Sequence, residues 1–209
     1  MKKIYYVILM GVACGFSSFS QVKDPSFTKE EFLEDFDILV ELVKKQHPNP
    51  FRSISEAAFD QQVAANRNKL KQNPSFENFV LYSPFGLLAD THLSLSTDPV
   101  FYESYVKTIH HFPLETLVYD NRVFVNQYTV NLPLGVELIS VNGQRVADLL
   151  KRIPKAADGF IEVNSQKDFT VYLPFLLPGA TSYDLVYKEV NSTVLKSSKL
   201  KGVPYVTYD

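Results

Sequence analysis

The chain has 209 residues, of which 45% are hydrophobic, so it holds enough apolar material for one large or two small folded domains. It carries 21 basic and 23 acidic residues, for a formal net charge of −2. Nucleic-acid binding depends on concentrated positive charge, and this balance therefore argues against nucleic acid as a partner.

Residues 1–20 are typical of a secretory signal peptide. Two lysines are followed by an apolar core over residues 4–16, and Ser18 and Ser20 are the small residues that a signal peptidase reads. We therefore expect cleavage before Gln21 and export to the periplasm, the cell surface or the medium. The apolar core is short for a membrane span, which needs about 20 residues. No stable span is expected, and an uncleaved anchor is the alternative.

Lipoprotein processing at Cys14 is a second alternative. Ala13 is the small residue that precedes a lipoprotein cysteine, but Gly11 stands where a bulky aliphatic residue is usual. Cys14 is also the only cysteine of the chain. After cleavage of the signal peptide the exported protein has no disulfide, so side-chain packing alone must hold its fold.

The following segment, residues 21–98, is expected to form three helices. Thr28 and Glu31 have the spacing of a capping box, as do Ser53 and Glu56. The apolar stripe of the first helix has helical period; it consists of Phe32, Phe36, Leu39 and Val43. The third helix is expected to begin after Asn73-Pro74-Ser75 and to be kinked or split at Pro84, because proline removes a backbone donor.

Beyond residue 92 the apolar period changes from helical to two, which predicts a β-rich domain over residues 99–205. The strand-like runs are 112–114, 117–119, 123–125, 136–141, 183–190 and 193–200. Asp120-Asn121, Asn142-Gly143 and Asn191-Ser192 are expected to form turns, and helices are expected over 146–153 and 166–177.

The four histidines are the candidate chemical groups. His92 lies at the junction between the last expected helix and the first alternating segment, with Asp90 and Thr91 just before it. A histidine can be a general base near neutral pH if a nucleophile lies within reach, and Asp90 or Thr91 would orient it. The alternative is a structural histidine that binds the last helical carbonyls. His47 is interpreted as a helix-end residue.

No metal site or cofactor is expected. His110 and His111 lack the further His, Asp, Glu or Cys residues at ligand spacing that a metal site requires. The chain also contains no G-x-S-x-G, Walker or dinucleotide-binding motif.

Residues 132–146 combine a Pro-Gly loop, a strand and an Asn-Gly turn, and they resemble the core of a PDZ-like domain. An export signal, helices separated by His47-Pro48-Asn49-Pro50-Phe51 and the Ala89-Asp90-Thr91-His92 junction precede this core. In this order, over residues 28–200, the chain resembles the N-terminal half of secreted tail-specific (C-terminal processing) serine peptidases of the branch related to the tricorn core.

The resemblance implies an α+β fold, with a three-helix unit over 21–98 and a PDZ-like domain over 99–205. It implies that the PDZ-like domain binds C-terminal segments of peptides or unfolded proteins by strand addition. In tricorn-like members the histidine at the end of the helical part is the general base, which points to His92. Ala89 and Thr91 depart from the family pattern and leave the pose of the ring open. Other branches use a lysine instead.

The family's catalytic α/β domain, which carries the serine nucleophile, is not found in these residues. We expect it in cis if the gene continues past Asp209, and we expect the 209-residue chain to be inactive as a peptidase by itself. Two alternatives remain from the sequence. One is a non-catalytic exported peptide-binding module, and the other is an exported structural or adhesive domain that shares only the fold.

Overall fold

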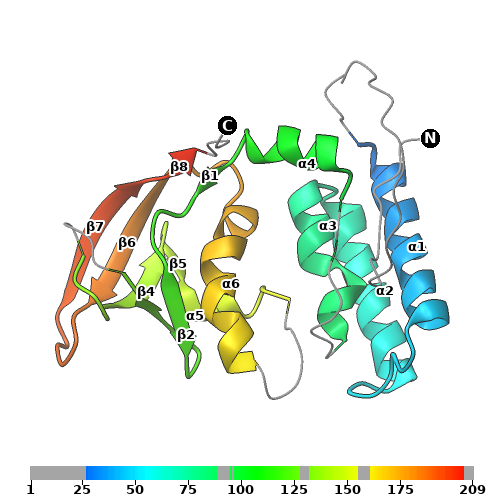
Figure 1. Cartoon of the computed structure of the whole chain (residues 1–209), viewed down its shortest axis with the longest axis horizontal. Coiled ribbons are helices and arrows are strands. Elements are labelled where there is room, and N and C mark those ends of the chain that lie inside the picture. The colour runs from blue at the N-terminus through cyan, green and yellow to red at the C-terminus, as the bar shows by residue number, and fades with distance from the viewer. Residues whose placement is uncertain (1–26, 89–94, 96, 128–131, 155–160, 205–209) are drawn as a thin grey trace. The chain divides into compact units, whose positions relative to one another are not determined.

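The computed structural model describes residues 27–88, 95, 97–127, 132–154 and 161–204, and for 161–168 it describes the backbone only. The chain divides into two compact units, Met1–Tyr105 and Val106–Asp209. The first unit is helical and the second is built around antiparallel sheets, so the chain is a mixed α+β protein (Figure 1). No helix in the described part of the chain is long and apolar enough to cross a membrane.

Helix α1 (Lys29–Gln46) begins at the predicted capping box. The Thr28 side chain accepts a hydrogen bond from the Glu31 backbone N–H, and the Glu31 carboxylate accepts one from the Thr28 backbone N–H. These bonds satisfy two donors that the first helical turn leaves unpaired. The predicted apolar stripe is buried, and Phe36 is fully inaccessible. Lys44 and Lys45 lie in the last turn, where their positive charge is favourable to the helix dipole.

Helix α2 (Glu56–Gln72) begins at a different cap from the one expected. Its N-cap is Ser55, whose hydroxyl accepts a hydrogen bond from the Ala58 backbone N–H, so the expected cap at Ser53 is wrong. Both positions carry serine, and the one followed at once by Glu56 takes the cap. Phe59 and Leu70 are fully buried on its inner face.

The expected third helix is split at Pro84. Helix α3 (Phe76–Tyr82) begins at the N-cap Ser75, and the 3₁₀ turn η1 (Pro84–Leu87) follows after Ser83. Proline at the start of η1 is favourable because its missing N–H would be unpaired there. Phe79 packs near Phe32 of α1, with ring centroids 6.0 Å apart, and closes the core of the helical unit.

Helix α4 (Pro99–Val106) is not among the elements expected from the sequence, which predicts a β-rich domain from residue 99 onward. Phe101 and Tyr105 contact the Phe76 ring at centroid distances of 4.9 and 4.6 Å, and the Tyr105 hydroxyl donates to Glu77. These contacts join α4 to the helical unit, which extends to Tyr105.

The second unit contains a six-stranded antiparallel sheet in the order β2-β3-β4-β6-β7, with β5 paired to β4. Its strands are β2 (Thr116–Tyr119), β3 (Arg122–Val125), β4 (Glu137–Val141), β5 (Gln144–Arg145), β6 (Ser182–Lys188) and β7 (Leu195–Lys201). A small separate pair is formed by β1 (His110–His111) and β8 (Val203–Pro204). The β6–β7 hairpin confirms the pairing expected around Asn191-Ser192.

Two tight turns confirm the expected turn residues. Asp120 and Asn121 have φ of 48° and 54° and join β2 to β3, and Asn142 and Gly143 have φ of 48° and 75° and join β4 to β5. Two successive residues with positive φ give the turn whose twist matches that of paired strands. The Asn142 side chain also accepts from the Asp184 backbone N–H at 2.7 Å, which ties the turn to β6.

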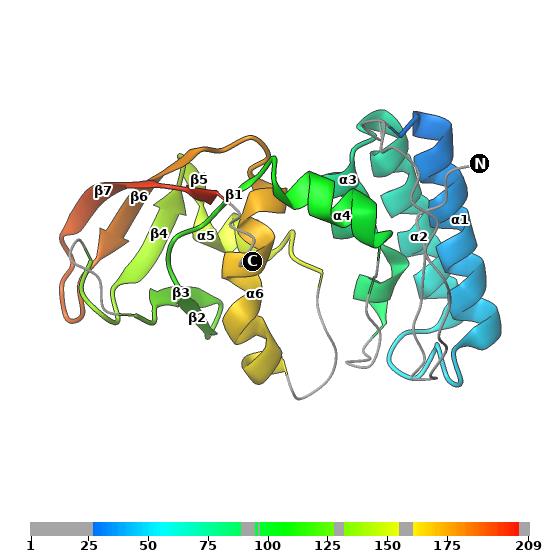
Figure 2. The ribbon, with the colours of Figure 1, turned by 45° about the horizontal axis from the view of Figure 1, so that its top comes forward.

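Helices α5 (Val146–Leu150) and α6 (Ile161–Leu176) complete the second unit. Helix α6 begins five residues before the predicted helix and lies beside β2 in two different views (Figures 1 and 2). Its Phe169 faces Phe112, which in turn contacts Tyr183 of β6. Residues 112–114 were expected as a strand, but Phe112 and Leu114 are buried in a non-strand segment around Pro113, which lacks a ladder donor.

Candidate functional site

The candidate catalytic group falls in a part of the chain that is not described. His92 and its orienting candidates Asp90 and Thr91 all lie in the segment 89–94, outside the described residues. Its role therefore stays a prediction from the sequence.

His47 is confirmed as a helix-end residue. It is the C-cap of α1, and its backbone N–H donates to the Val43 carbonyl. Its Nδ1 accepts a hydrogen bond of 3.1 Å from the Asn49 backbone N–H and thereby closes the turn after the helix. The imidazole serves the local backbone here.

His110 and His111 form strand β1, which pairs with β8. Burial, followed by the neighbouring His110, lowers the pKa of His111. Neutral imidazole is the form that a metal would bind, but the described residues contain no group of three His, Cys, Asp or Glu side chains that could hold a metal ion.

The backbone edge of β2 that faces away from β3 is the first feature of the fold to which another strand could pair. Strand β2 is the first strand of the sheet, and the described residues pair it with β3 alone. Its register is set by the tight Asp120-Asn121 turn, beside which Tyr119 and Arg122 form a hydrogen-bonded pair. The bond from the Asn126 N–H to the Glu115 carbonyl, at 2.9 Å, lies at the same phase of the ladder.

Along an antiparallel pair of strands, successive residues alternate between facing the partner strand and facing away from it, and this determines which backbone groups of β2 point away from β3. The N–H and C=O groups of Leu117 and Tyr119 face β3, while those of Thr116 and Val118 face the opposite side, called the open edge of β2 below. Within the described part of the chain no backbone hydrogen bond reaches Thr116 or Val118 from that side. An unpaired edge of this kind is a template for an added strand.

Helix α6 is fixed beside the open edge by a polar contact. The Thr170 hydroxyl donates to the Leu114 carbonyl at 2.9 Å, and the Thr116 hydroxyl lies 2.8 Å from the same Thr170 oxygen. Since the Thr170 proton is directed to Leu114, Thr116 is the donor in the second bond. The start of β2 and the middle of α6 are thereby held together, and the Thr116 side chain is buried.

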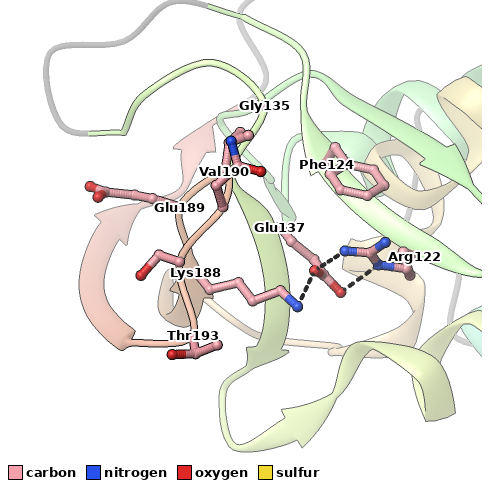
Figure 3. Close-up of a pocket in the computed structure, with 10 residues that line it drawn as sticks. Arg122, Phe124, Gly135, Glu137, Lys188, Glu189, Val190 and Thr193 are labelled. Carbon is pink, nitrogen blue, oxygen red and sulfur yellow. Dashed lines mark hydrogen bonds and ion pairs between the residues drawn. The ribbon is translucent and has the colours of Figure 1, made fainter.

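A charged cluster lies on the other face of the sheet from the buried core side chains of β3, β4 and β6. Phe124, Glu137 and Lys188 stand in register on three neighbouring strands. Arg122 Nε donates to Glu137 Oε1 at 2.8 Å, its Nη2 donates to Oε2, and Lys188 Nζ lies 2.8 Å from Oε2 (Figure 3). One carboxylate thus binds two cations.

The electrostatics of this cluster keep Glu137 ionised. Hydrogen bonds from Arg122, opposed by burial and supported by Lys188, lower the pKa of Glu137 to about 2. The Arg122 guanidinium carbon also lies 4.9 Å from the centre of the Phe124 ring, within the range of a cation–π contact. The side chains of Arg122 and Lys188 nevertheless remain partly exposed, at 46% and 33%.

The sequence places Glu137 in the strand-like run 136–141 but does not single it out. The available signal was an acidic residue inside an apolar run, because a buried carboxylate requires cationic partners. Which cations supply them depends on strand register, which residue spacing does not give.

The chain was compared with known proteins: no protein-family model matches it, and neither does any curated protein.

Proposed function

We propose that the second unit is a PDZ-like module that binds an extended polypeptide segment by strand addition at the open edge of β2. In this proposal the chain is the N-terminal, substrate-binding part of an exported serine peptidase of the tail-specific type. The observation that carries the proposal is the outward-facing backbone of Thr116 and Val118 beside α6.

Strand addition fits this edge for a physical reason. A peptide that lies along β2 would exchange main-chain hydrogen bonds with Thr116 and Val118, which any sequence can do. Side chains of alternate peptide residues would then contact α6, and these contacts would give selectivity. Binding of this kind suits unfolded proteins and chain ends, which expose free backbone.

The peptidase part of the proposal rests on the resemblance in the sequence. His92 would be the general base and would take the proton of a serine supplied by a domain outside these 209 residues. Asp90 or Thr91 would orient its ring. A non-catalytic peptide-binding module remains the alternative, and it shares the same binding edge.

The decisive experiment removes a backbone N–H that faces the open edge of β2 and leaves the hydrogen bonds between β2 and β3 in place. In Val118→Pro the missing N–H is one that faces the open edge, and proline is tolerated on an edge strand in that orientation. In the matched variant Leu117→Pro the missing N–H is one that bonds β3. We expect Val118→Pro to keep the fold and Leu117→Pro to lose much of its stability.

Binding is measured with residues 21–209 and a set of unstructured peptides of varied C-terminal sequence, by fluorescence anisotropy. The unchanged chain is expected to bind some of them, and Val118→Pro to bind at least about tenfold more weakly. A folded Val118→Pro variant that binds as well as the unchanged chain would refute strand addition at β2. Binding that is lost when the peptides are C-terminally amidated would identify chain ends as the preferred segment.

A further inference from the structure

A pocket of about 380 Å³ lies on the face of the sheet that carries the charged cluster (Figure 3). Its wall is formed by Arg122 and Phe124 of β3 and Glu137 of β4, and Lys188 at the end of β6 and the following residues 189–193 close another side. Ligand pockets in proteins are typically about 300–1,000 Å³, so this volume lies at the lower end of the range and suits a small ligand.

The charges inside the pocket do not cancel. Arg122 and Lys188 both point at the Glu137 carboxylate, which leaves one excess positive charge. Glu189 also belongs to the lining, but Figure 3 shows its side chain turned the other way, and it binds Lys196 at 2.7 Å. The pocket thus attracts an anion.

The two cations also have donors to spare. A guanidinium carries five N–H groups and an ammonium three, whereas the contacts with Glu137 use two of the first and one of the second. Glu137, by contrast, already accepts from both cations. A cationic ligand would therefore compete with Arg122 and Lys188 for one carboxylate, while an anionic ligand would use hydrogens that the cluster leaves available.

The rest of the lining is partly apolar. The Phe124 ring lies beside the guanidinium, and Val190 is 64% exposed at the pocket. Gly135 lies next to Val190, since a Cβ at this position would be in van der Waals contact with Val190 Cγ2 at 3.5 Å. An anion with a short apolar body matches this combination better than a fully hydrated ion such as phosphate does.

We propose that this pocket is a binding site for a carboxylate carried on a short apolar body, with Arg122 and Lys188 as its ligand-binding cations. Such a carboxylate occurs in a free acid of amino-acid size and in an acidic side chain of a peptide. The site is separate from the open edge of β2, and neither proposal depends on the other.

The test uses residues 21–209 labelled with ¹⁵N and three probes. N-acetylvaline carries the carboxylate, N-acetylvalinamide is its neutral counterpart, and a capped Val-Asp-Val peptide presents the carboxylate on a side chain. We expect N-acetylvaline to cause saturable shifts of the amides of Phe124, Gly135 and residues 188–193, with a dissociation constant in the millimolar range, and the amide counterpart to cause none. Comparison with the peptide separates a free-acid site from a side-chain site.

Two variants change the charge of the pocket in opposite directions. Lys188→Met removes one cation while Arg122 still holds Glu137, and it should weaken N-acetylvaline binding at least about fivefold. Glu137→Gln removes the competing anion and should strengthen binding several-fold, a change that misfolding cannot imitate. Lys199→Met is the matched control, because Lys199 pairs with Asp184 elsewhere on the sheet, and it should leave the affinity unchanged.

Three outcomes would overturn the proposal. The first is the absence of saturable shifts with N-acetylvaline at concentrations well above the millimolar range. The second is equal binding of the acid and its amide. The third is weaker binding by Glu137→Gln in a variant whose spectrum remains that of a folded protein, because the cluster would then act only as a tie between strands.

Discussion

Single residues with unusual backbone or electrostatic settings hold the second unit in register. Asn142 and Gly143 take the left-handed conformation that the β4–β5 turn requires, and the Asn142 side chain bonds β6. Glu137 joins three strands through Arg122 and Lys188. Each of these two features can be tested by a single substitution.

Replacement of Gly143 by valine should lower the free energy of unfolding by more than roughly 1 kcal/mol. Apart from Gly143 itself and its two chain neighbours, no described residue lies within 4 Å of a Cβ added at Gly143, so the cost is one of backbone conformation at φ of 75° and not of a clash. Gly143→Asn is the control, since asparagine tolerates this region, and it should cost less. An unchanged midpoint of thermal unfolding in Gly143→Val would contradict the turn.

Glu137 should make folding depend on acid pH. The pKa of Glu137 is lowered to about 2 in the folded protein from its ordinary value of 4.5, which applies in the unfolded chain. The unfolded chain therefore binds the proton more readily. The stabilisation is therefore complete above about pH 4.5 and declines as the pH falls toward 2. Urea unfolding of the unchanged chain and of Glu137→Gln at pH 7 and pH 3 measures the effect.

The gap in stability between the two proteins should shrink at pH 3. Asp184→Asn is the control, because Asp184 and its partner Lys199 are both exposed and a surface pair contributes little. A gap that stays constant from pH 7 to pH 3 would show that the carboxylate is not stabilised by its cations.

At the scale of elements, the helices of the first unit depend on their caps. Thr28→Ala removes the acceptor for the Glu31 N–H and should cost about 1 kcal/mol, whereas Thr28→Ser retains the hydroxyl and should cost much less. Chemical unfolding followed by circular dichroism at 222 nm compares the two. Equal losses for alanine and serine would mean that the threonine methyl group, and not the cap, stabilises α1.

The turns and helices of both units show which elements can be predicted from neighbouring residues and which cannot. The turns at Asp120-Asn121 and Asn142-Gly143 were predictable because turn conformation depends on the turn residues themselves. Helix α4 was not, because its 8 residues have no strong period and are stabilised by Phe76 and Glu77, which lie over 20 residues earlier. The cap of α2 was misplaced by two residues, since two serines compete for it.

For the molecule as a whole, the peptidase hypothesis predicts that the 209-residue chain hydrolyses no peptide. The reason is that the sequence contains no nucleophile motif beside which His92 could act. Purified 21–209 should therefore leave a denatured protein intact, as judged by mass spectrometry. Turnover that persists through purification and disappears in His92→Ala would refute the prediction and would place a complete active site in this chain.

The sequence by itself determined those features of the fold that depend on residues close together in the chain. It determined the capping box at Thr28, the split at Pro84 and the tight turns, because each depends on contacts within about four residues. The helical period of the apolar residues also marked the stripe that α1 buries, although other helices supply the contacts that bury it. It also indicated the mixed α+β composition through the change of apolar period near residue 92.

Only the tertiary structure decided which groups meet across the second unit. Glu137 finds Arg122 and Lys188 at separations of 15 and 51 residues, and the register of β3, β4 and β6 alone brings the three together. The open edge of β2 likewise depends on the order of the strands: the tight Asp120-Asn121 turn sets the phase of β2 with β3, but only the fold shows that, among the described residues, no further strand pairs with β2. The residues of a hairpin fix its own phase, but they do not determine whether another strand lies on its outer side, because that depends on segments far away in the sequence.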